Sequence, residues 1–396
     1  MQFNPFSDEF FNDPYETYRQ LRDEAPVYHN EEWGFYALSR FEDVVEAHID
    51  HRTYSSARGV LIQDMDPAML EAVPMMILMD PPKQTRLRKL LSSRFTPRKV
   101  QAMEPVLREL AASILEPLRE RDSFDFVKDY SSVYPMDFIS QLMGVPVEDR
   151  LPIRNLVDAS LTRRADTPDI PPSAIHAMGE MTQYFRDFIA ERRRNPKEDL
   201  ISELMSAEVT RDDGKRDRLT DAELLGFASL LAAAGAETTT KLMSNTLVLT
   251  WRHPEVHKRV VEDPAAIAGT IEESLRYWPP SQIQGRSATR EVELHGVTIP
   301  EGSRVLLLTG AACRDERQYH DPDRFDIDRE ISLQIALGHG THKCLGSFLA
   351  RLETRVSFEE FFKRFPSFEV HEEACERVHM SNVAGYSAVP LSVTGG

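Results

Sequence analysis

The sequence predicts a mainly α-helical protein with a small β part, arranged as one domain over residues 1–396. Three observations support this fold class. Apolar residues recur with helical spacing over most of the chain, the strand-like segments are short, and no Ser/Gly linker or internal repeat divides the sequence. Hydrophobic residues make up 41% of the chain, which is enough to bury a large core.

The first half of the chain begins with a predicted hairpin at Val27–Leu38, where apolar flanks enclose a polar turn. Helical spacing follows at residues 41–48, 84–95, 105–120, 134–143, 174–194 and 198–207. The segment Arg163–Pro172, RRADTPDIPP, predicts a loop between two of these helices rather than a domain boundary.

The second half contains the longest predicted helix. Thr220 and Glu223 form a capping-box pattern, and the helix that they start extends to Trp251. Further helices are predicted at residues 254–261, 265–277 and 347–362, and short strands at 290–298, 303–308 and 389–394.

The composition excludes several classes of protein. A formal net charge of −17 argues against a nucleic-acid binder. Three cysteines in a chain of this length form no disulfide framework, which fits a reducing cytoplasm. The N-terminus lacks the apolar run of a signal peptide, and the longest apolar stretch is too short to span a bilayer, so we expect no membrane anchor.

The segment Leu337–Gly346, LGHGTHKCLG, carries the strongest functional signal. Its glycines allow sharp turns and close approach to a flat ligand, and Cys344 lies just before a predicted helix whose N-terminus favours a thiolate. A thiolate on such a loop can serve as an axial haem ligand. Three other interpretations remain at this point: a buried packing cysteine, an ordinary turn, or a zinc site with His339 and His342, which the tight spacing disfavours.

This loop resembles the haem-ligating loop of the cytochrome P-450 family, with Leu337 in place of the usual Phe. The stretch Ala234–Thr239, AGAETT, is similar to the oxygen-activating stretch of the same family. Its small residues would leave room for a planar cofactor, and we expect the Thr238 hydroxyl to bond to the carbonyl of Ala234. Without the loop, an Ala-rich helix-packing face would be the commoner explanation of this segment.

Further motifs occur in the order typical of the family. Glu273 and Arg276 form a Glu-x-x-Arg pair, and Arg324 lies where the family has the third member of a fold-fixing triad. Arg286, His342 and Arg88 are candidates for binding the haem propionates. Gln84 stands where the family has a histidine, so it supplies no charge, and Cys313 is expected to be a packing cysteine.

The resemblance implies the mainly α P-450 fold, with haem b between the long central helix and the cysteine loop. It implies a monooxygenase that uses O2 and a small apolar substrate, with electrons from NAD(P)H through ferredoxin reductase and a ferredoxin. Glu237 and Thr238 would be catalytic. The expected haem contacts are Cys344 as the iron ligand with His342, Arg286, Arg88, Gln84, Ala234, Gly235, Leu337, Gly338 and Gly346. A peroxide-using haem-thiolate enzyme and a non-catalytic haem sensor or carrier are the alternatives.

Two further expectations concern the partners of this site. The segment Lys83–Lys99 has seven basic residues and no acid, which fits either a solvated helix face or, with Lys343, a docking face for an acidic ferredoxin. Residues 59–79, 279–285 and 381–388 should face the substrate. They are mostly apolar and methionine-rich, with a few polar groups (Gln282, Gln284, Ser381 and Asn382), which predicts a terpenoid, steroid or fatty-acid substrate.

Overall fold

The computed structural model describes residues 3–8, 10, 13–165, 167–210, 214–380 and 382–393. Its α-helices in the first half are α2 Tyr15–Glu24, α3 Phe41–Ile49, α4 Pro67–Ala72, α5 Lys83–Ser92, α6 Pro97–Gln101, α7 Glu104–Leu115, α8 Val133–Met143, α9 Val147–Leu161, α10 Pro172–Arg194 and α11 Leu200–Ser206. The second half contributes α12 Asp221–Arg252, α13 Pro254–Glu262, α14 Ala266–Tyr277, α15 Thr309–Ala312 and α16 Ser347–Arg364. Short helical turns are η1 Met76–Leu78, η2 Glu116–Glu120, η3 Phe126–Ser131, η4 Ile335–Leu337, η5 Gly340–His342 and η6 Glu372–Ala374.

The strands form two larger sheets and three two-stranded ones. The five-stranded sheet has the order β1-β2-β10-β7-β3, from β1 Val27–Asn30, β2 Phe35–Leu38, β10 Arg304–Leu308, β7 Ile283–Ala288 and β3 Tyr54–Ser55. The three-stranded sheet pairs β11 Phe368–Val370, β14 Pro390–Val393 and β4 Ser123–Asp125. The remaining pairs are β5 Glu208–Thr210 with β6 Arg216–Arg218, β8 Val292–Leu294 with β9 Val297–Ile299, and β12 Glu376–Arg377 with β13 Tyr386–Ala388.

The mainly α fold class is confirmed, and the predicted helices are present. The strand predicted at 290–298 is wrong in form, because this segment folds as the two strands β8 and β9 of a hairpin, and β7 was not predicted. The hairpin at 27–38 is β1–β2, and the loop at 163–172 connects α9 to α10. Five α-helices were missed, the longer α2 and α9 and the short α4, α6 and α15. In α9 the signal is obscured by Pro152, which removes a backbone N–H from the helix interior and breaks the sequence pattern. The predicted strand at 389–394 is β14 as far as residue 393, and residue 394 lies outside the described residues.

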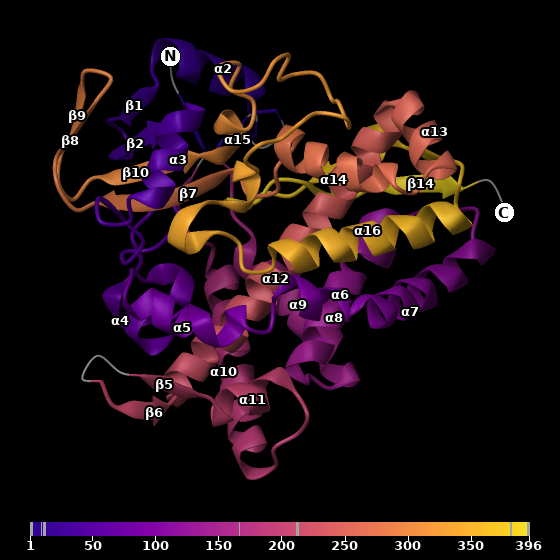
Figure 1. Cartoon of the computed structure of the whole chain (residues 1–396), viewed down its shortest axis with the longest axis horizontal. Coiled ribbons are helices and arrows are strands. Elements are labelled where there is room, and N and C mark those ends of the chain that lie inside the picture. The colour runs from indigo at the N-terminus through magenta and orange to yellow at the C-terminus, as the bar shows by residue number, and fades with distance from the viewer. Residues whose placement is uncertain are drawn as a thin grey trace.

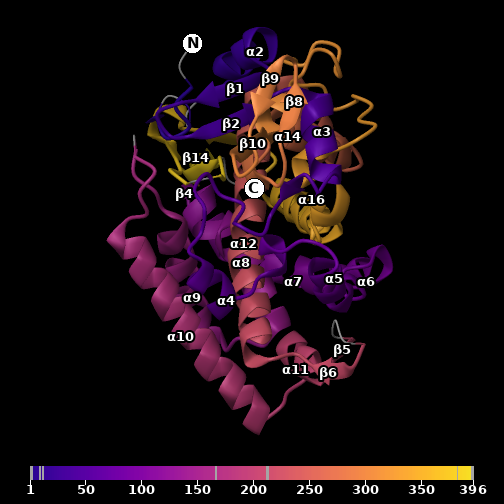
Figure 2. The same cartoon turned by 90° about the vertical axis from the view of Figure 1, so that its left-hand side faces the viewer.

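Helix α12 forms the axis of the molecule. Figure 2 shows it passing through the middle, with α9 and α10 on one side and α16 on the other. The predicted capping box starts this helix: Thr220 Oγ1 accepts from the Glu223 N–H at 3.2 Å, and Glu223 accepts from the Thr220 N–H at 2.8 Å. Most side chains from Glu223 to Thr250 are buried, because helices cover α12 on several sides.

The five-stranded sheet lies at one end of α12, above the loop that precedes α16 (Figure 1). Strand β10 is the central strand of this sheet, because it pairs parallel with β2 and antiparallel with β7. The antiparallel register places Arg286 opposite Val305 in the sheet interior.

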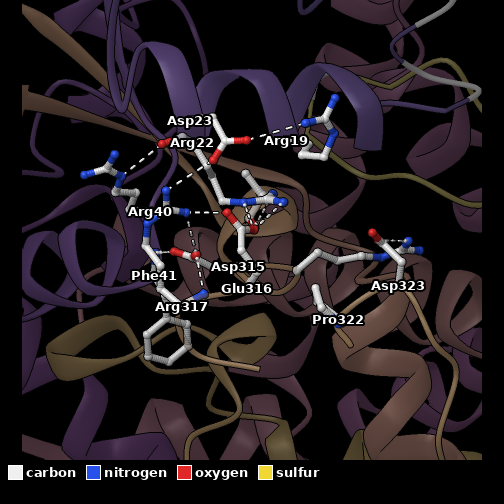
Figure 3. A network of polar contacts seen from close by, with 12 residues as sticks. Arg19, Arg22, Asp23, Arg40, Phe41, Asp315, Glu316, Arg317, Pro322 and Asp323 are labelled. Atoms are coloured by element: carbon white, nitrogen blue, oxygen red, sulfur yellow. Dashed lines mark hydrogen bonds and ion pairs between the residues drawn. The ribbon is translucent and has the colours of Figure 1, made fainter. Parts of the chain in front are cut away.

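A polar network fastens α2 to the segment 311–323 (Figure 3). Arg22 is buried, donates from Nη1 to the Ala311 carbonyl at 3.0 Å and pairs with Glu316 at 3.1 Å. The backbone N–H of Phe41 donates to Asp315 Oδ2 at 2.8 Å, which joins the start of α3 to the same segment. Segments almost 300 residues apart are thereby joined on the side of the fold that leads to the cysteine loop.

Across the described parts of the chain, no helix combines the length and the apolar character that crossing a membrane requires.

Candidate functional site

A cavity of about 400 Å³ lies between α12 and the loop of Cys344. Its volume is within the range typical of ligand sites. Every residue that the sequence analysis assigned to cofactor or catalysis lines this cavity: Gln84, Arg88, Ala234, Gly235, Glu237, Thr238, Arg286, Leu337, Gly338, His342, Cys344 and Gly346. The structure therefore brings together residues from α5, α12, β7 and the cysteine loop.

The cysteine loop is a closed turn between η4 and α16. The N–H of Cys344 donates to the Leu337 carbonyl at 2.7 Å, which closes the loop at its two ends. Gly338 and Gly340 have φ values of +68° and +64°, a conformation that L side chains rarely adopt. A Cβ at residue 340 would also lie 2.5 Å from the His48 carbonyl oxygen, so both glycines are required by the path of the loop.

The thiol of Cys344 faces the cavity and lies at the start of α16. Burial by the surrounding protein raises the pKa of this thiol, whereas the Gly346 N–H, Arg88, Arg351 and Lys343 lower it. The N–H group at the start of α16 therefore favours the thiolate, as expected. The net pKa of the thiol is nevertheless raised, because desolvation is the larger effect. A bound metal ion deprotonates a coordinating thiol outright.

The other two cysteines lie away from the cavity. Cys313 is completely buried, and its carbonyl accepts from Arg276 at 3.0 Å, as expected of a packing cysteine. Cys375 is half-buried at η6. Over the described ranges, no group of three or more His, Cys, Asp or Glu side chains is placed to hold a metal ion, so the zinc interpretation of the loop gains no support.

Nitrogen donors without acceptors gather on one side of the cavity. Arg286 is 3% exposed, donates only to the Gly285 carbonyl and forms no ion pair within the described chain. His342 Nε2 and both ring nitrogens of His48 are buried without a hydrogen-bond partner. Leaving buried donors unpaired is costly, so the arrangement fits a ligand that brings anionic oxygen atoms to this wall.

Burial controls the charge of these groups. Desolvation, with the nearby Arg286, lowers the pKa of His342 to about 4 and that of His48 to about 3. Desolvation also lowers the pKa of Arg286 to about 10, which leaves its guanidinium protonated at neutral pH. The wall therefore combines a buried cation with two neutral imidazoles, each of which carries a single N–H, and the ring of His342 also bonds to the Met79 backbone. A wall with such a cation suits carboxylates such as the propionates of haem.

His48 was missed by the sequence analysis. It lies in α3, nearly 300 residues before the cysteine loop, and only the packing of α3 against η5 brings it to the cavity. A single histidine on an amphipathic helix carries no signal of this kind.

Arg88 and Gln84 hold the cysteine loop from α5. Gln84 is buried and donates from Nε2 to the Thr341 carbonyl at 2.7 Å, and Arg88 Nη2 donates to the Lys343 carbonyl. The amide of Gln84 thus contacts the loop backbone, while Arg88 also lines the cavity.

The α12 side of the cavity contains the expected local bond. Thr238 Oγ1 donates to the Ala234 carbonyl at 2.9 Å, so this prediction is confirmed. Ala234 is exposed to the cavity, but a Cβ at Gly235 would come within 3.2 Å of Ile139 Cγ1 on α8. Gly235 therefore both lines the cavity and allows α12 to pack closely against α8.

Glu237 is part of a buried charged cluster. Its Oε1 lies 2.6 Å from Nζ of Lys241, one turn later on α12, and both side chains are about 5% exposed or less. The carboxyl of Asp158 on α9 hydrogen-bonds to that of Glu237. The Glu237–Lys241 spacing was visible in the sequence as an i,i+4 pair, but Asp158 lies in the helix that was missed.

The triad below the loop differs from the expected one. Arg276 binds Glu273 through two hydrogen bonds of 2.7 Å, and both residues are buried. The third member is Arg329, whose Nε lies 3.2 Å from Glu273 Oε1, and not Arg324. Arg324 has an exposed side chain and contributes only its backbone carbonyl, which accepts from Arg276 and Arg329.

The distal wall combines the predicted segments with two helices. The lining residues there are Val60, Leu61, Met76, Ile77, Leu161, Leu230, Leu231, Ala233, Pro280, Ser281, Gln284, Asn382 and Val383. Gln282 is turned away, because it accepts from Tyr18 and donates to the Pro279 carbonyl, so its expected place in the cavity is wrong. Ser381 lies outside the described residues.

Comparison with known proteins agrees with this geometry. A family model described as cytochrome P-450 matches residues 34–388. The chain is 43% identical over 395 residues to a putative cytochrome P-450 123 of Mycobacterium tuberculosis, covering 98% of this chain and 96% of the relative. It is 37% identical over 399 residues to a vitamin D(3) 25-hydroxylase of Pseudonocardia autotrophica, covering 99% and 96%. The solved structure of CYP109E1 from Bacillus megaterium in complex with testosterone is similar, with a TM-score of 0.88, 29% identity and coverage of 98% and 99%.

Proposed function

Because the chain belongs to the cytochrome P-450 family, whose members are haem-binding monooxygenases, we propose that its cavity oxidises a mostly apolar molecule of terpenoid, steroid or fatty-acid type. The observation that carries this proposal is the distal wall. Its side chains from residues 60–77, α9 and α12 are almost all aliphatic or methionine, and its polar atoms gather at residues 281–284 and 382. Hydrophobic walls with few polar groups are typical of sites for such ligands. Relatives whose names mention vitamin D(3) or testosterone agree with this class.

The polar end of the cavity favours a substrate with an oxygen function. Gln284 is already engaged, since its Nε2 donates to Ser281 Oγ at 2.6 Å and its Oε1 accepts from Thr309 Oγ1. Because Ser281 accepts that bond, its own O–H is the donor that serves a substrate oxygen.

A ligand titration tests the substrate class. Apolar sterols, terpenoids and fatty acids should shift the Soret band of the ferric protein, and small highly charged compounds should not. Ser281→Ala should weaken binding of a hydroxylated steroid about fivefold, the equivalent of one neutral hydrogen bond, and leave binding of a hydrocarbon analogue unchanged. A Soret shift caused only by small charged compounds would contradict the proposal.

We assign the iron ligand to Cys344 and the propionate contacts to Arg286, His342 and Arg88, with His48 as an added donor. Gln84 supports the loop through Thr341, and Ala234, Gly235, Leu337, Gly338 and Gly346 form the walls against the ring. When bound, haem supplies the oxygen-activating and electron-transfer chemistry. Cys344→Ala should lose the thiolate signature in the carbon monoxide difference spectrum, and Cys313→Ala and Cys375→Ala should retain it.

The residues of α12 handle protons in this proposal. The carboxylate of Glu237 is a proton acceptor at the edge of the cavity, and the Thr238 hydroxyl donates to the Ala234 carbonyl at 2.9 Å. The threonine oxygen can still accept a hydrogen bond from water while it donates to the carbonyl. Together they position water and deliver protons during turnover.

We also propose that a ferredoxin, reduced by ferredoxin reductase and NAD(P)H, docks beside the cysteine loop. Lys89, Arg98, Lys99 and Lys343 are exposed around it, and Phe348 is 47% exposed next to the loop. Arg94 pairs with Glu203 at 3.0 Å, so it contributes less charge than expected. Attraction between opposite charges predicts reduction rates that fall with salt and with Lys89→Glu or Lys99→Glu, at unchanged substrate affinity. Reduction that is insensitive to both changes would refute the docking face.

A further inference from the structure

The cluster of Asp158, Glu237 and Lys241 joins the outside of the protein to the cavity. Glu237 lines the cavity, and its carboxylate is held by Lys241 Nζ at 2.6 Å on the same helix. On its other side it hydrogen-bonds to Asp158 of α9. Glu237 and Lys241 are buried, whereas Asp158 is only partly buried, which makes it the member of the cluster that solvent reaches most easily.

The charges of this cluster require a shared proton. Two carboxylates face one ammonium group, so the fully ionised cluster would bury an uncompensated negative charge, which is costly. A hydrogen bond between two carboxyl groups also needs a proton on one of them. Burial and the charge of Glu237 raise the pKa of Asp158 to about 7, against lowering by Lys241 and Arg154.

Within the described parts of the chain, the charged groups that act on Asp158 are Glu237, Lys241 and Arg154. Arg154, one turn earlier on α9, is the nearest further charge, and it also faces Asp137 of α8. Tyr184 of α10 bonds to Asp149 near the start of α9, at 2.8 Å. Asp158 therefore has a carboxyl partner in Glu237 and a side chain that is still partly exposed.

We propose that Asp158 is the outer proton carrier of this enzyme, which takes a proton from bulk water and passes it to Glu237 across the bond between their carboxyl groups. In each transfer the O–H bond of Asp158 breaks as an O–H bond forms on Glu237, and water then reprotonates Asp158. Lys241 is a positioning residue, because it fixes the Glu237 carboxylate between Asp158 and the cavity. This inference rests on the proposed role of Glu237 in proton delivery.

A purely structural role must be separated from proton transfer. Asp158 could simply fasten α9 over α12, since Leu161 of α9 lines the cavity. Asp158→Asn separates the two roles, because its amide still donates a hydrogen bond to Glu237 but cannot release a proton. Asp158→Ala removes both functions, and Glu148→Gln on the same helix is the matched control, because Glu148 is exposed.

The first measurement is an infrared pH titration of the haem-loaded protein. We expect a protonated-carboxyl C=O band that disappears as the pH rises through about 7. The band should be lost in Asp158→Asn and kept in Glu148→Gln. A band that persists in Asp158→Asn with the same midpoint would overturn the proposal.

The second measurement is substrate oxidation per NAD(P)H in H2O and D2O across pH. Asp158→Asn and Asp158→Ala should both slow product formation, by up to about 10²-fold, with a larger solvent isotope effect and a flattened pH profile near 7. Asp158→Glu should restore most of the rate. If Asn behaves as wild type and only Ala is impaired, Asp158 is a fastening residue and the inference is wrong. Glu237→Gln distinguishes failure of this inference from failure of the proposed role of Glu237. If Glu237→Gln also forms product at the wild-type rate, the proposed role of Glu237 is wrong as well.

Discussion

Glu272 and Glu273 are adjacent residues of α14 that form ion pairs in opposite environments. Glu273 and its partner Arg276 are about 1% exposed or less, and Glu273 also accepts from the Asp326 N–H at 2.9 Å. Glu272 pairs with Arg351 of α16, with both side chains about one-third exposed. Replacing each glutamate by glutamine changes the same charge on the same helix and so isolates the effect of burial.

Glu273→Gln should be strongly destabilising. It leaves the Arg276 guanidinium buried without a counter-charge, for which about 3–5 kcal/mol is typical. A surface pair such as Glu272–Arg351 contributes about 0–1 kcal/mol. An unfolding entropy of about 2.1 cal/mol/K per residue over 396 residues gives about 0.8 kcal/mol/K. The expected fall in Tm is therefore about 4–6 °C for Glu273→Gln and about 1 °C or less for Glu272→Gln.

Differential scanning calorimetry of the two variants and the wild type, with haem bound, measures this difference. The carbon monoxide spectrum should also decline in Glu273→Gln, because the segment that Glu273 holds precedes the cysteine loop. Equal Tm shifts in the two variants, or a shift below about 1 °C in Glu273→Gln, would refute the reasoning from burial.

Three further changes test the site itself. Thr238→Ala should release more peroxide per NAD(P)H, while Thr238→Ser keeps the bonding hydroxyl and should behave as wild type; an unchanged product-to-NAD(P)H ratio in the alanine variant would show a purely helical role. Arg286→Gln should accelerate haem loss to apomyoglobin about 10–100-fold, because a hydrogen bond from a charged group contributes about 1.5–3 kcal/mol. Equal rates of haem loss in the variant and the wild type would show that Arg286 does not contact a propionate. Raising the pKa of Asp158 from 3.8 to about 7 makes the folded state bind its proton more tightly, so stability from this group falls as the pH rises from about 4 to 7. The Tm of Asp158→Asn minus the Tm of the wild type should consequently increase from pH 5 to pH 8. A difference in Tm that does not change with pH would contradict the assigned pKa.

Local sequence signals predicted those parts of the site that lie within one element. The capping box at Thr220, the Thr238 bond to Ala234 and the positive-φ glycines of the cysteine loop are short-range features. Each depends on residues a few positions apart, so the sequence determines it almost alone. The recognised motifs then gave the order of α12, α14 and the loop along the chain.

The remaining parts depend on contacts between distant segments. His48 reaches the cavity only because α3 packs on η5, and Asp158 meets Glu237 only because α9 crosses α12. Arg329 replaces Arg324 in the triad because the turn at residues 321–329 points the nearer side chain to solvent. In each case the residue type is common on any helix or loop, so the sequence offers several candidates and only the packing selects one.

The charges around the cavity divide into two sets with different tasks. On the loop side, the cations that line the cavity are Arg286, Arg88 and Lys343, and burial lowers the pKa of His48 to about 3 and that of His342 to about 4, so this wall is positively charged. A positively charged wall of this kind suits a ligand with two carboxylates, such as haem. On the α12 side, Lys241 matches one of two carboxyl groups, which leaves a single exchangeable proton at Asp158. The loop side thus has an excess of positive charge that an anionic ligand can neutralise, whereas the α12 side has one carboxyl group more than its cation, and this excess is what we propose keeps a proton available there at neutral pH.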